Sequence, residues 1–285
     1  MLFLRNSKVN IIQVTGANKG IGFAIVKGLC QKFDGKVYLT ARNTIKGNAA
    51  VCKLRKMGYR PVFHQLDISD NESIKKFRDY ILKQEGGIDL LFNNAGINLK
   101  KCVDDYAKQV ENVINVNYFG PSNTCEILNS TLRYGAKIIN TSSYYGHLSH
   151  IPSRALRSQF TSPTLSIDGL HYLMRKYISD VKLNKQIEEG WGDDPYAVSK
   201  VGLSALTIVL QKYFDNEPEK RQISVNSFHP GYIKTDLTEN HGKDTPEKGA
   251  VPALFIALES EALRGQFIWN NLVTIDWYSP IPPTN

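Results

Sequence analysis

The sequence lacks the features of a membrane-spanning or disulfide-rich protein. No apolar run among its 285 residues reaches the roughly 18–20 residues that crossing a bilayer requires. The apolar opening, residues 1–4, is too short for the apolar region of a signal peptide, and Arg5 follows it directly. The cysteines are few and widely spaced, with no CxxC or Cys/His ligand pattern; they are Cys30, Cys52, Cys102 and Cys125. We therefore expect a cytoplasmic protein with reduced cysteines and without a metal site.

The basic residues are also not gathered into runs. The net charge of +8 makes nucleic-acid binding a function to consider. However, Lys and Arg are scattered along the chain, and no run of five like charges occurs. Attraction to an anionic small ligand, such as a phosphorylated cofactor, accounts for the excess charge equally well. We therefore expect neither a nucleic-acid partner nor a membrane partner.

Apolar runs typical of buried strands alternate with helical patterns along the first half of the chain. The expected strands are 9–15, 36–41, 61–66, 88–92 and 136–141, and the expected helices are 20–32, 44–57, 71–84 and 103–132. Such alternation is typical of right-handed βαβ units and of a parallel sheet with helices on both faces. The sequence therefore predicts an α/β fold with a doubly wound parallel sheet.

The alternation stops between His147 and Trp191. This stretch holds prolines, arginines and a helical pattern near 170–181, but no strand pattern. Alternation resumes with a helix at 194–214, a strand at 222–228, a helix at 246–258 and a last strand near 266–269. No linker, repeat or low-complexity block divides the chain. We therefore expect a single domain over residues 1–285, with a helical insertion at about 147–191.

A glycine-rich turn, TGANKGIG, lies between the first strand and the first helix. Glycines let the backbone turn sharply and approach a pyrophosphate, and the helix N-terminus offers free N–H groups and partial positive charge. The spacing is GxxxGxG, which a plain tight turn could also show, but the strand before it and the helix after it favour dinucleotide binding. The expected cofactor-binding residues of the turn are Gly16, Asn18, Lys19, Gly20, Ile21 and Gly22.

The end of the second strand indicates which nicotinamide cofactor binds. NAD sites usually place an acidic side chain there to bind the ribose 2′-hydroxyl. Here the strand ends in LTAR without a carboxylate, and Arg42 stands where a 2′-phosphate would lie. Lys19 adds a second cation inside the glycine turn, with no competing acid. The sequence therefore predicts NADP(H) as the cofactor.

Polar residues close the third and fourth strands at the same edge of the sheet. Asp67 could accept a hydrogen bond from the adenine amino group, and Ile68 follows it. In the NNAG segment, Asn93 and Asn94 supply amides that could bridge neighbouring strand ends. Either feature alone is also typical of a helix cap or a turn. Together they border the crevice where α/β folds bind ligands.

A tyrosine and a lysine four positions apart share one face of the helix expected at 194–214. The charge of Lys200 would lower the pKa of Tyr196 from its usual value near 10, so that the phenol could exchange a proton with a substrate oxygen. A second YxxxK pair, Tyr172 and Lys176, lies in the insertion with no strand on either side. We therefore assign the chemistry to Tyr196 and Lys200. Ser143, after the fifth strand, presents a hydroxyl at the same edge.

The motifs TGxxxGIG, NNAG, a serine pair, YxxxK and PG, in this order, resemble the short-chain dehydrogenase/reductase family over nearly the whole chain. The segments GANKGIG, LTAR, FHQLDI and PGYIKTD are most similar to those of the monomeric NADPH-dependent carbonyl reductases. The resemblance implies a Rossmann-type fold. Ser143 stands 53 positions before Tyr196, farther than in most of the family, and carbonyl reductases share a helical insertion of about this size. That insertion covers the surface by which tetrameric relatives assemble, so the resemblance implies a monomer.

The resemblance also implies roles for the reactive residues. Tyr196 would be the general acid that protonates the carbonyl oxygen. Lys200 would hold the nicotinamide ribose and tune Tyr196. Ser143 would hydrogen-bond the substrate oxygen, and Asn117 would anchor a proton-relay water. On the nicotinamide side, Ile233 and Thr235 would contact the carboxamide.

The expected wall of the substrate pocket departs from the family pattern. The matching positions are Tyr144, Tyr145, Tyr232, Leu237 and Thr238. Family members often have smaller aliphatic residues beside the serine and a tryptophan at the Tyr232 position. The tyrosines favour an aromatic cleft suited to flat or hydrophobic carbonyls. His229, before Pro230, is a further departure and could be a loop histidine without a role.

We expect an NADPH-dependent reductase of aldehydes, ketones or quinones, whose partner is a small-molecule carbonyl substrate. The alternative among enzymes is an NADP-dependent dehydrogenase of a specific alcohol, such as a hydroxysteroid or hydroxyprostaglandin. A non-catalytic NADP(H) sensor could keep the same fold. Such a sensor would have no need of Ser143, Tyr196 and Lys200 together.

Overall fold

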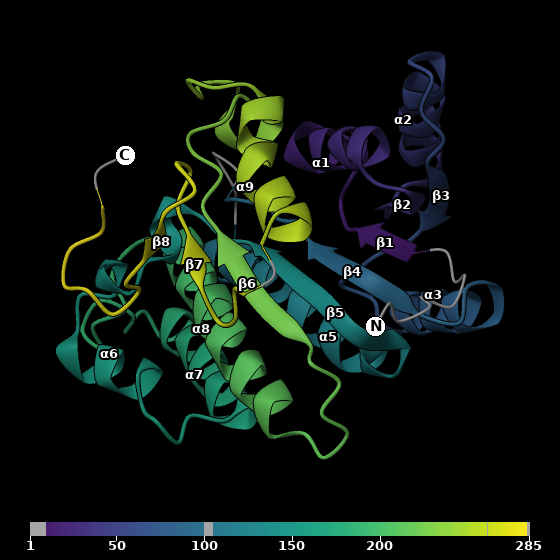
Figure 1. Cartoon of the computed structure of the whole chain (residues 1–285). Helices are drawn as coiled ribbons and strands as arrows, with labels where there is room; N and C mark the ends of the chain where they lie inside the picture. Colours follow the sequence, from purple (N-terminus) through teal and green to yellow (C-terminus); the bar gives the residue numbers. More distant parts are fainter. Residues whose placement is uncertain (1–9, 100–104, 261, 284–285) are drawn as a thin grey trace.

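The computed structural model describes residues 10–99, 105–260 and 262–283, and its strands form one eight-stranded sheet (Figure 1). The strand order is β3-β2-β1-β4-β5-β6-β7-β8, and all neighbours are parallel except β7 and β8. The strands are β1 (Asn10–Val14), β2 (Gly35–Ala41), β3 (Val62–Gln65), β4 (Ile88–Asn93), β5 (Leu132–Thr141), β6 (Ser224–Phe228), β7 (Phe267–Ile268) and β8 (Thr274–Ile275). The prediction of a doubly wound parallel sheet is confirmed.

Helices cover both faces of this sheet. They are α1 (Gly20–Lys32), α2 (Thr44–Lys56), α3 (Asn71–Gln84), α4 (Tyr106–Ile114), α5 (Gly120–Leu128), α6 (Arg154–Phe160), α7 (Ile167–Lys182), α8 (Pro195–Asn216) and α9 (Pro246–Leu258). Figure 1 shows α1, α2 and α9 on one side and α3, α5, α7 and α8 on the other. Successive strand residues point to opposite faces, so Leu91 joins the core under α3 and α5 while Phe92 joins the core under α1 and α9.

Four elements differ from the sequence-based prediction. The helix expected at 103–132 is two helices joined by a π-helical turn, Asn115–Phe119, and its first two residues lie outside the described chain. Strand β5 begins four residues early, because a register shift against β4 and the positive φ of Gly135 (+74°) break the alternation that marks a strand. Helix α6 and strand β8 are too short to produce a periodic pattern.

The stretch 147–191 contains no strand, as predicted, and is built around two helices. Helix α7 packs against α4 and α8. Trp191 is buried at the end of the stretch, and its indole donates to the Asp180 carboxylate at 2.7 Å. Lys176 pairs with the same carboxylate at 2.6 Å, whereas Tyr172 is 66% exposed. The Tyr172/Lys176 pair is therefore part of a structural ion-pair network and not a site.

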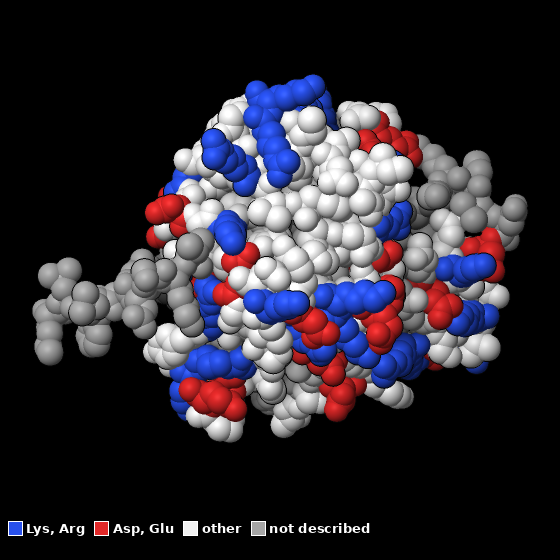
Figure 2. Space-filling model, turned by 90° about the vertical axis from the view of Figure 1, so that its right-hand side faces the viewer, with Lys and Arg blue, Asp and Glu red and all other residues white. Residues whose placement is uncertain are grey.

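The surface charge is mixed. On the face in Figure 2, acidic side chains lie among the basic ones over the lower half, and the centre is largely uncharged. Within the described part of the chain, no helix has the length and apolar character needed to cross a membrane.

Candidate active site

The glycine-rich turn joins β1 to α1 at the carboxyl edge of the sheet. Gly16 and Gly20 have φ angles of +62° and +56°, which favour glycine. A Cβ at Gly22 would lie 2.4 Å from Asn94 Nδ2, so a larger residue would collide. Lys19 stands at the N-cap without a capping side chain, and the first turn of α1 has no acidic residue. This turn therefore has the features of a pyrophosphate cradle. Asn18 and Ile21 are half-buried on it.

Amides of the NNAG segment tie neighbouring strands together, as predicted. Asn94 Nδ2 donates to the Thr15 carbonyl at 2.9 Å, and Thr15 Oγ1 accepts from the backbone N–H groups of Asn94 and Ala95. Asn93 Nδ2 donates to Asn140 Oδ1 at 2.9 Å. These bonds link the glycine turn, β4 and β5 into one rigid edge.

The adenine end of the expected cofactor site is shaped by Asp67 and Ile68. Asp67 Oδ1 accepts from the Ser69 N–H at 3.0 Å and from the Ser69 hydroxyl at 2.6 Å, so the carboxylate holds a tight turn. Ile68 is 6% exposed and packs beside Gly120. The turn role of Asp67 is thus present in the structure. Its bond to an adenine amino group stays a prediction.

The cation arrangement corrects one expectation. Lys19 does meet an acid: its ammonium pairs with the Asp236 carboxylate at 2.5 Å. The expectation of no competing acid was wrong because Asp236 is 217 positions away in the sequence. Arg42 is exposed after β2 and forms no ion pair with the described residues. Lys46, in the first turn of α2, is a further cation near Asp236 that sequence reasoning missed.

The predicted reactive residues converge at the carboxyl ends of β4 and β5. Tyr196 lies in the first turn of α8, whose N-cap Asp194 accepts from the Tyr196 N–H at 2.9 Å. The Lys200 ammonium donates to the Thr141 carbonyl at 2.7 Å and lies 5.7 Å from the centre of the Tyr196 ring. A hydrogen bond joins Ser143 to the Tyr196 hydroxyl. The 53-residue separation in sequence therefore closes to direct contact.

Asn117 lies in the π-helical turn between α4 and α5. Its side chain is fully buried, donating to the Ile97 carbonyl at 2.9 Å and to Ser199 Oγ at 3.0 Å and accepting from the Ile97 N–H at 2.8 Å. A Cβ at Gly96 would lie 3.3 Å from Asn117 Oδ1 and 3.6 Å from Lys200 Nζ. Asn117 and Lys200 therefore border the same small space. Single π turns inside helices frequently mark functional sites.

The segment after Pro230 lies against the glycine turn. Ile233 is 2% exposed, and its side chain packs on Gly249. Thr235 is the N-cap of the short helix Asp236–Thr238, and its methyl group would meet a Cβ at Gly20 at 3.3 Å. Both residues thus border the site from the side opposite α8.

Comparison with known proteins decides the family. The profile of the family described as short chain dehydrogenase matches residues 10–155. The chain is 38% identical over 268 residues to carbonyl reductase (NADPH) 3 of Rattus norvegicus, covering 91% of this chain and 96% of that protein. This chain belongs to the short chain dehydrogenase family.

Other members of the family agree with this assignment. Carbonyl reductase (NADPH) 1 of Homo sapiens is 35% identical over 268 residues, covering 92% of this chain and 97% of that protein. Among solved structures, salutaridine reductase from Papaver somniferum superimposes with a TM-score of 0.82 at 27% identity, covering 90% of this chain and 99% of that chain.

The electrostatics of the tyrosine and lysine of this short chain dehydrogenase differ from the sequence-based expectation. Burial raises the pKa of Tyr196 to about 12, and the hydrogen bond from Ser143 only partly offsets it. Burial lowers the pKa of Lys200 to about 8. The predicted lowering of the Tyr196 pKa is therefore wrong for this structure, because desolvation raises the pKa and the nearby Asp194 and Tyr145 raise it further. The phenol therefore stays protonated at neutral pH, but its raised pKa makes it a weaker acid than a tyrosine in water.

The expected pocket wall is aromatic but divides into two environments. Tyr145 is 43% exposed, with its ring 6.1 Å from that of Tyr196, and Tyr232 is 47% exposed. Tyr144 is half-buried instead and packs against His229 and Trp269 at ring distances of 6.3 and 5.9 Å. Leu237 and Thr238 lie in the short helix after Thr235.

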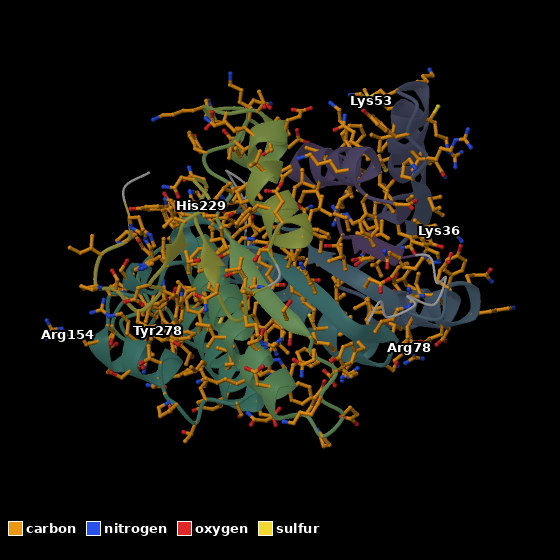
Figure 3. The ribbon with its side chains drawn as sticks, viewed as in Figure 1. Lys36, Lys53, Arg78, Arg154, His229 and Tyr278 are labelled. Atoms are coloured by element: carbon orange, nitrogen blue, oxygen red, sulfur yellow. The ribbon has the colours of Figure 1, made fainter. Side chains whose placement is uncertain are left out.

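His229 is a buried residue at the end of β6 (Figure 3). Its ring lies 4.5 Å from that of Trp269, and its Nδ1 accepts from the Gly231 N–H at 3.3 Å. It therefore holds the turn after β6 and supports Tyr144, which the sequence did not reveal.

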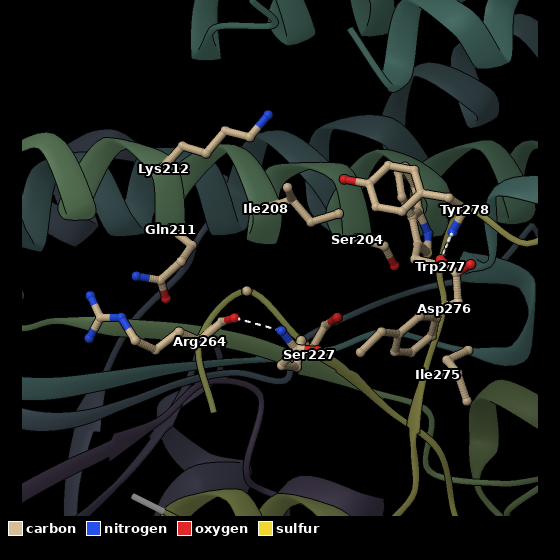
Figure 4. Close-up of a pocket in the computed structure, with 13 residues that line it drawn as sticks. Ser204, Ile208, Gln211, Lys212, Ser227, Arg264, Ile275, Asp276, Trp277 and Tyr278 are labelled. Carbon is tan, nitrogen blue, oxygen red and sulfur yellow. Dashed lines mark hydrogen bonds between the residues drawn. The ribbon is translucent and has the colours of Figure 1, made fainter. Parts of the chain in front are cut away.

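A cavity of about 340 Å³ lies behind the segment that carries Ser143, between α8, β6, β7 and β8 (Figure 4). Ser204, on its wall, shares a hydrogen bond with Ser142 at 2.7 Å. Trp277 donates from its indole to the Gly146 carbonyl at 2.7 Å. Both contacts brace the segment that carries Ser143, and Trp277 gave no signal in the sequence because its partner is 131 positions away. The described residues hold no cluster of three or more metal-ligating side chains.

Proposed function

We propose that this protein is an NADPH-dependent carbonyl reductase that converts aldehydes, ketones or quinones to alcohols. The observation that carries the proposal is the contact of Tyr196 with Ser143, beside a buried Lys200, at the sheet edge that also holds the glycine turn. The similarity to carbonyl reductases over more than nine tenths of the chain supports it. NADP(H), when bound, supplies the hydride.

The chain's own residues position and protonate the substrate. Tyr196 donates a proton to the carbonyl oxygen while Ser143 hydrogen-bonds the same oxygen. Lys200 holds the nicotinamide ribose and supplies positive charge beside the phenol. Asn117 orders a water that restores the proton to Tyr196. The cofactor is held by Gly16, Asn18, Gly20, Ile21 and Gly22 at the pyrophosphate and by Lys19 and Arg42 at the 2′-phosphate, with Asp67, Ile68, Asn94, Ile233 and Thr235 lining its remaining contacts.

The function is tested by NADPH oxidation with quinones, aromatic aldehydes, isatin-like diketones and keto-steroids. We expect turnover with flat, hydrophobic carbonyls, because the Tyr145 ring packs beside that of Tyr196 and Tyr144 packs on Tyr145. We also expect NADPH to bind more tightly than NADH, because Arg42 offers a cation to the 2′-phosphate. If no carbonyl stimulates NADPH oxidation, the sensor hypothesis is favoured. Equal affinity for NADPH and NADH would contradict the NADP(H) assignment.

The protein is proposed to act as a monomer with a single domain over residues 1–285. Helix α7 of the insertion packs against α4 and α8, and the resemblance to carbonyl reductases implies that such an insertion covers the surface used for assembly. We therefore expect sedimentation velocity at micromolar concentration to give one species of monomer mass, close to 32.1 kDa. A stable tetramer would contradict this assignment.

We further propose that the protein resides in the cytoplasm. Cys30, Cys52 and Cys125 are unpaired, while Cys102 lies outside the described residues. Burial raises the pKa of the Cys30 thiol to about 11 and that of Cys125 to about 12, so both stay as unreactive thiols. Fractionation of cells producing the protein would test this location.

A further inference from the structure

The segment 232–244, between β6 and α9, folds as a unit held by its own hydrogen bonds. Ile233 and Asp244 form a parallel bridge, and the Lys234 N–H donates to the Asp244 carbonyl at 2.8 Å. The Thr238 hydroxyl donates to the Ile233 carbonyl at 2.6 Å. These bonds hold the backbone on both sides of the short helix Asp236–Thr238. The carboxylate of Asp236 is thus presented from a preorganised position.

This unit meets the glycine turn at two points. The Thr235 methyl group lies 3.3 Å from where a Cβ at Gly20 would stand. Next to it, the Lys19 ammonium pairs with the Asp236 carboxylate at 2.5 Å. The two side chains are 62% and 68% exposed, so the pair contributes little to folding stability. We therefore look for an effect of the pair on the binding of an anionic ligand at Lys19.

The charges around this pair come from two more elements. Lys19 and Lys46 both lower the pKa of the Asp236 carboxyl, so this group is ionised at neutral pH. Arg42 lies two positions before the start of α2, which carries Lys46 in its first turn. Lys19 and Lys46 are thus the two cations that act on this carboxylate. The Asp236 carboxylate is paired with Lys19, the cation that lies in the glycine turn.

We infer that Asp236 sets the affinity of this site for a ribose 2′-phosphate, by competing with the phosphate for Lys19 and repelling it. The inference rests on the proposed function, which places the 2′-phosphate at Lys19 and Arg42. A phosphate monoester carries about 1.5–2 negative charges at pH 7, so it feels the carboxylate more strongly than a hydroxyl does. Asp236 therefore weakens NADPH binding selectively and favours exchange of the spent cofactor.

The test is the substitution Asp236→Asn, with binding measured by calorimetry. The probes are adenosine 2′,5′-bisphosphate, which carries the phosphate without the nicotinamide, and adenosine 5′-monophosphate, which lacks it. We expect the bisphosphate to bind about three- to tenfold more tightly to the variant, the size expected for a unit charge repelling a phosphate a few ångströms away in water. The monophosphate should bind equally to both proteins. The gain should fade in about 0.5 M salt, because mobile ions screen exposed charges.

Asp244→Asn is the matched control. It removes the same charge from the same unit, but Asp244 pairs with Lys248 and not with Lys19. We expect this variant to bind the bisphosphate within about twofold of the unmodified protein, because the Asp244 carboxylate pairs with Lys248 and does not compete for Lys19.

Three outcomes would overturn the inference. Unchanged bisphosphate affinity in Asp236→Asn would show that Asp236 does not compete with the phosphate for Lys19. Weaker binding would mean that Asp236 orients Lys19 for the phosphate. Equal binding of both nucleotides to the unmodified protein would show that the 2′-phosphate is not bound at this site. Failure of the proposed function is distinguishable, since a protein that shows the predicted gain but reduces no carbonyl would refute only the reductase activity.

Discussion

Tyr196→Phe is expected to lower kcat by about 100- to 10,000-fold, the range that a positioned general acid contributes. The phenol is hydrogen-bonded to Ser143, and its ring lies 5.7 Å from the Lys200 ammonium. Phenylalanine keeps the ring and the packing against Tyr145 but has no proton to donate. NADPH affinity should change little. Steady-state kinetics with a carbonyl substrate and fluorescence titration of NADPH measure the two quantities.

The second YxxxK pair supplies the control. Tyr172→Phe makes the same chemical change on α7, where the side chain is 66% exposed and distant from the sheet edge. It should leave kcat and the cofactor affinity unchanged. If Tyr196→Phe retained most of the turnover while binding NADPH normally, Tyr196 would not be the general acid.

Lys200→Met is expected to lower kcat by about 100- to 1,000-fold, the size of loss seen when one preorganised charge-stabilising donor is removed. The ammonium is 3% exposed and is held by the Thr141 carbonyl at 2.7 Å. Methionine fills the same space without a charge or a donor. The affinity for NADPH should also fall, because the nicotinamide ribose loses its partner. Lys212→Met, at an exposed position of the same helix, is the matched control and should leave both quantities unchanged.

The pH dependence of carbonyl reduction distinguishes the contribution of the Lys200 charge from that of its side-chain packing. Because burial lowers its pKa to about 8, carbonyl reduction by the unmodified protein should decline as pH rises through about 8, where the ammonium loses its proton. The residual rate of Lys200→Met should lack this decline. Stability changes in the opposite direction. The unfolded chain keeps the lysine protonated up to its ordinary pKa of 10.5, so the folded form gains stability as pH rises from about 8 toward 10.5. An unchanged decline in the methionine variant would assign it to another group.

Much of the site was predictable because its signals are local. Gly16 and Gly20, which have positive φ, follow a buried strand. Such a turn can be recognised in the sequence without knowing which residues pack on it. The amide bridges of Asn93 and Asn94 followed from the rule that parallel strands end at one edge. The π-helical turn around Asn117 was not predictable, since the apolar spacing of α4 and α5 reads as one continuous helix.

The sequence by itself determined the doubly wound sheet, the glycine turn and the pairing of Tyr196 with Lys200, since each depends on residues a few positions apart. Only the tertiary structure decided that Asp236 reaches Lys19 and that burial raises the pKa of Tyr196. The reason is physical: the periodicity of a strand or helix is set by its own backbone, whereas a charge and its desolvation depend on what distant segments bring beside it.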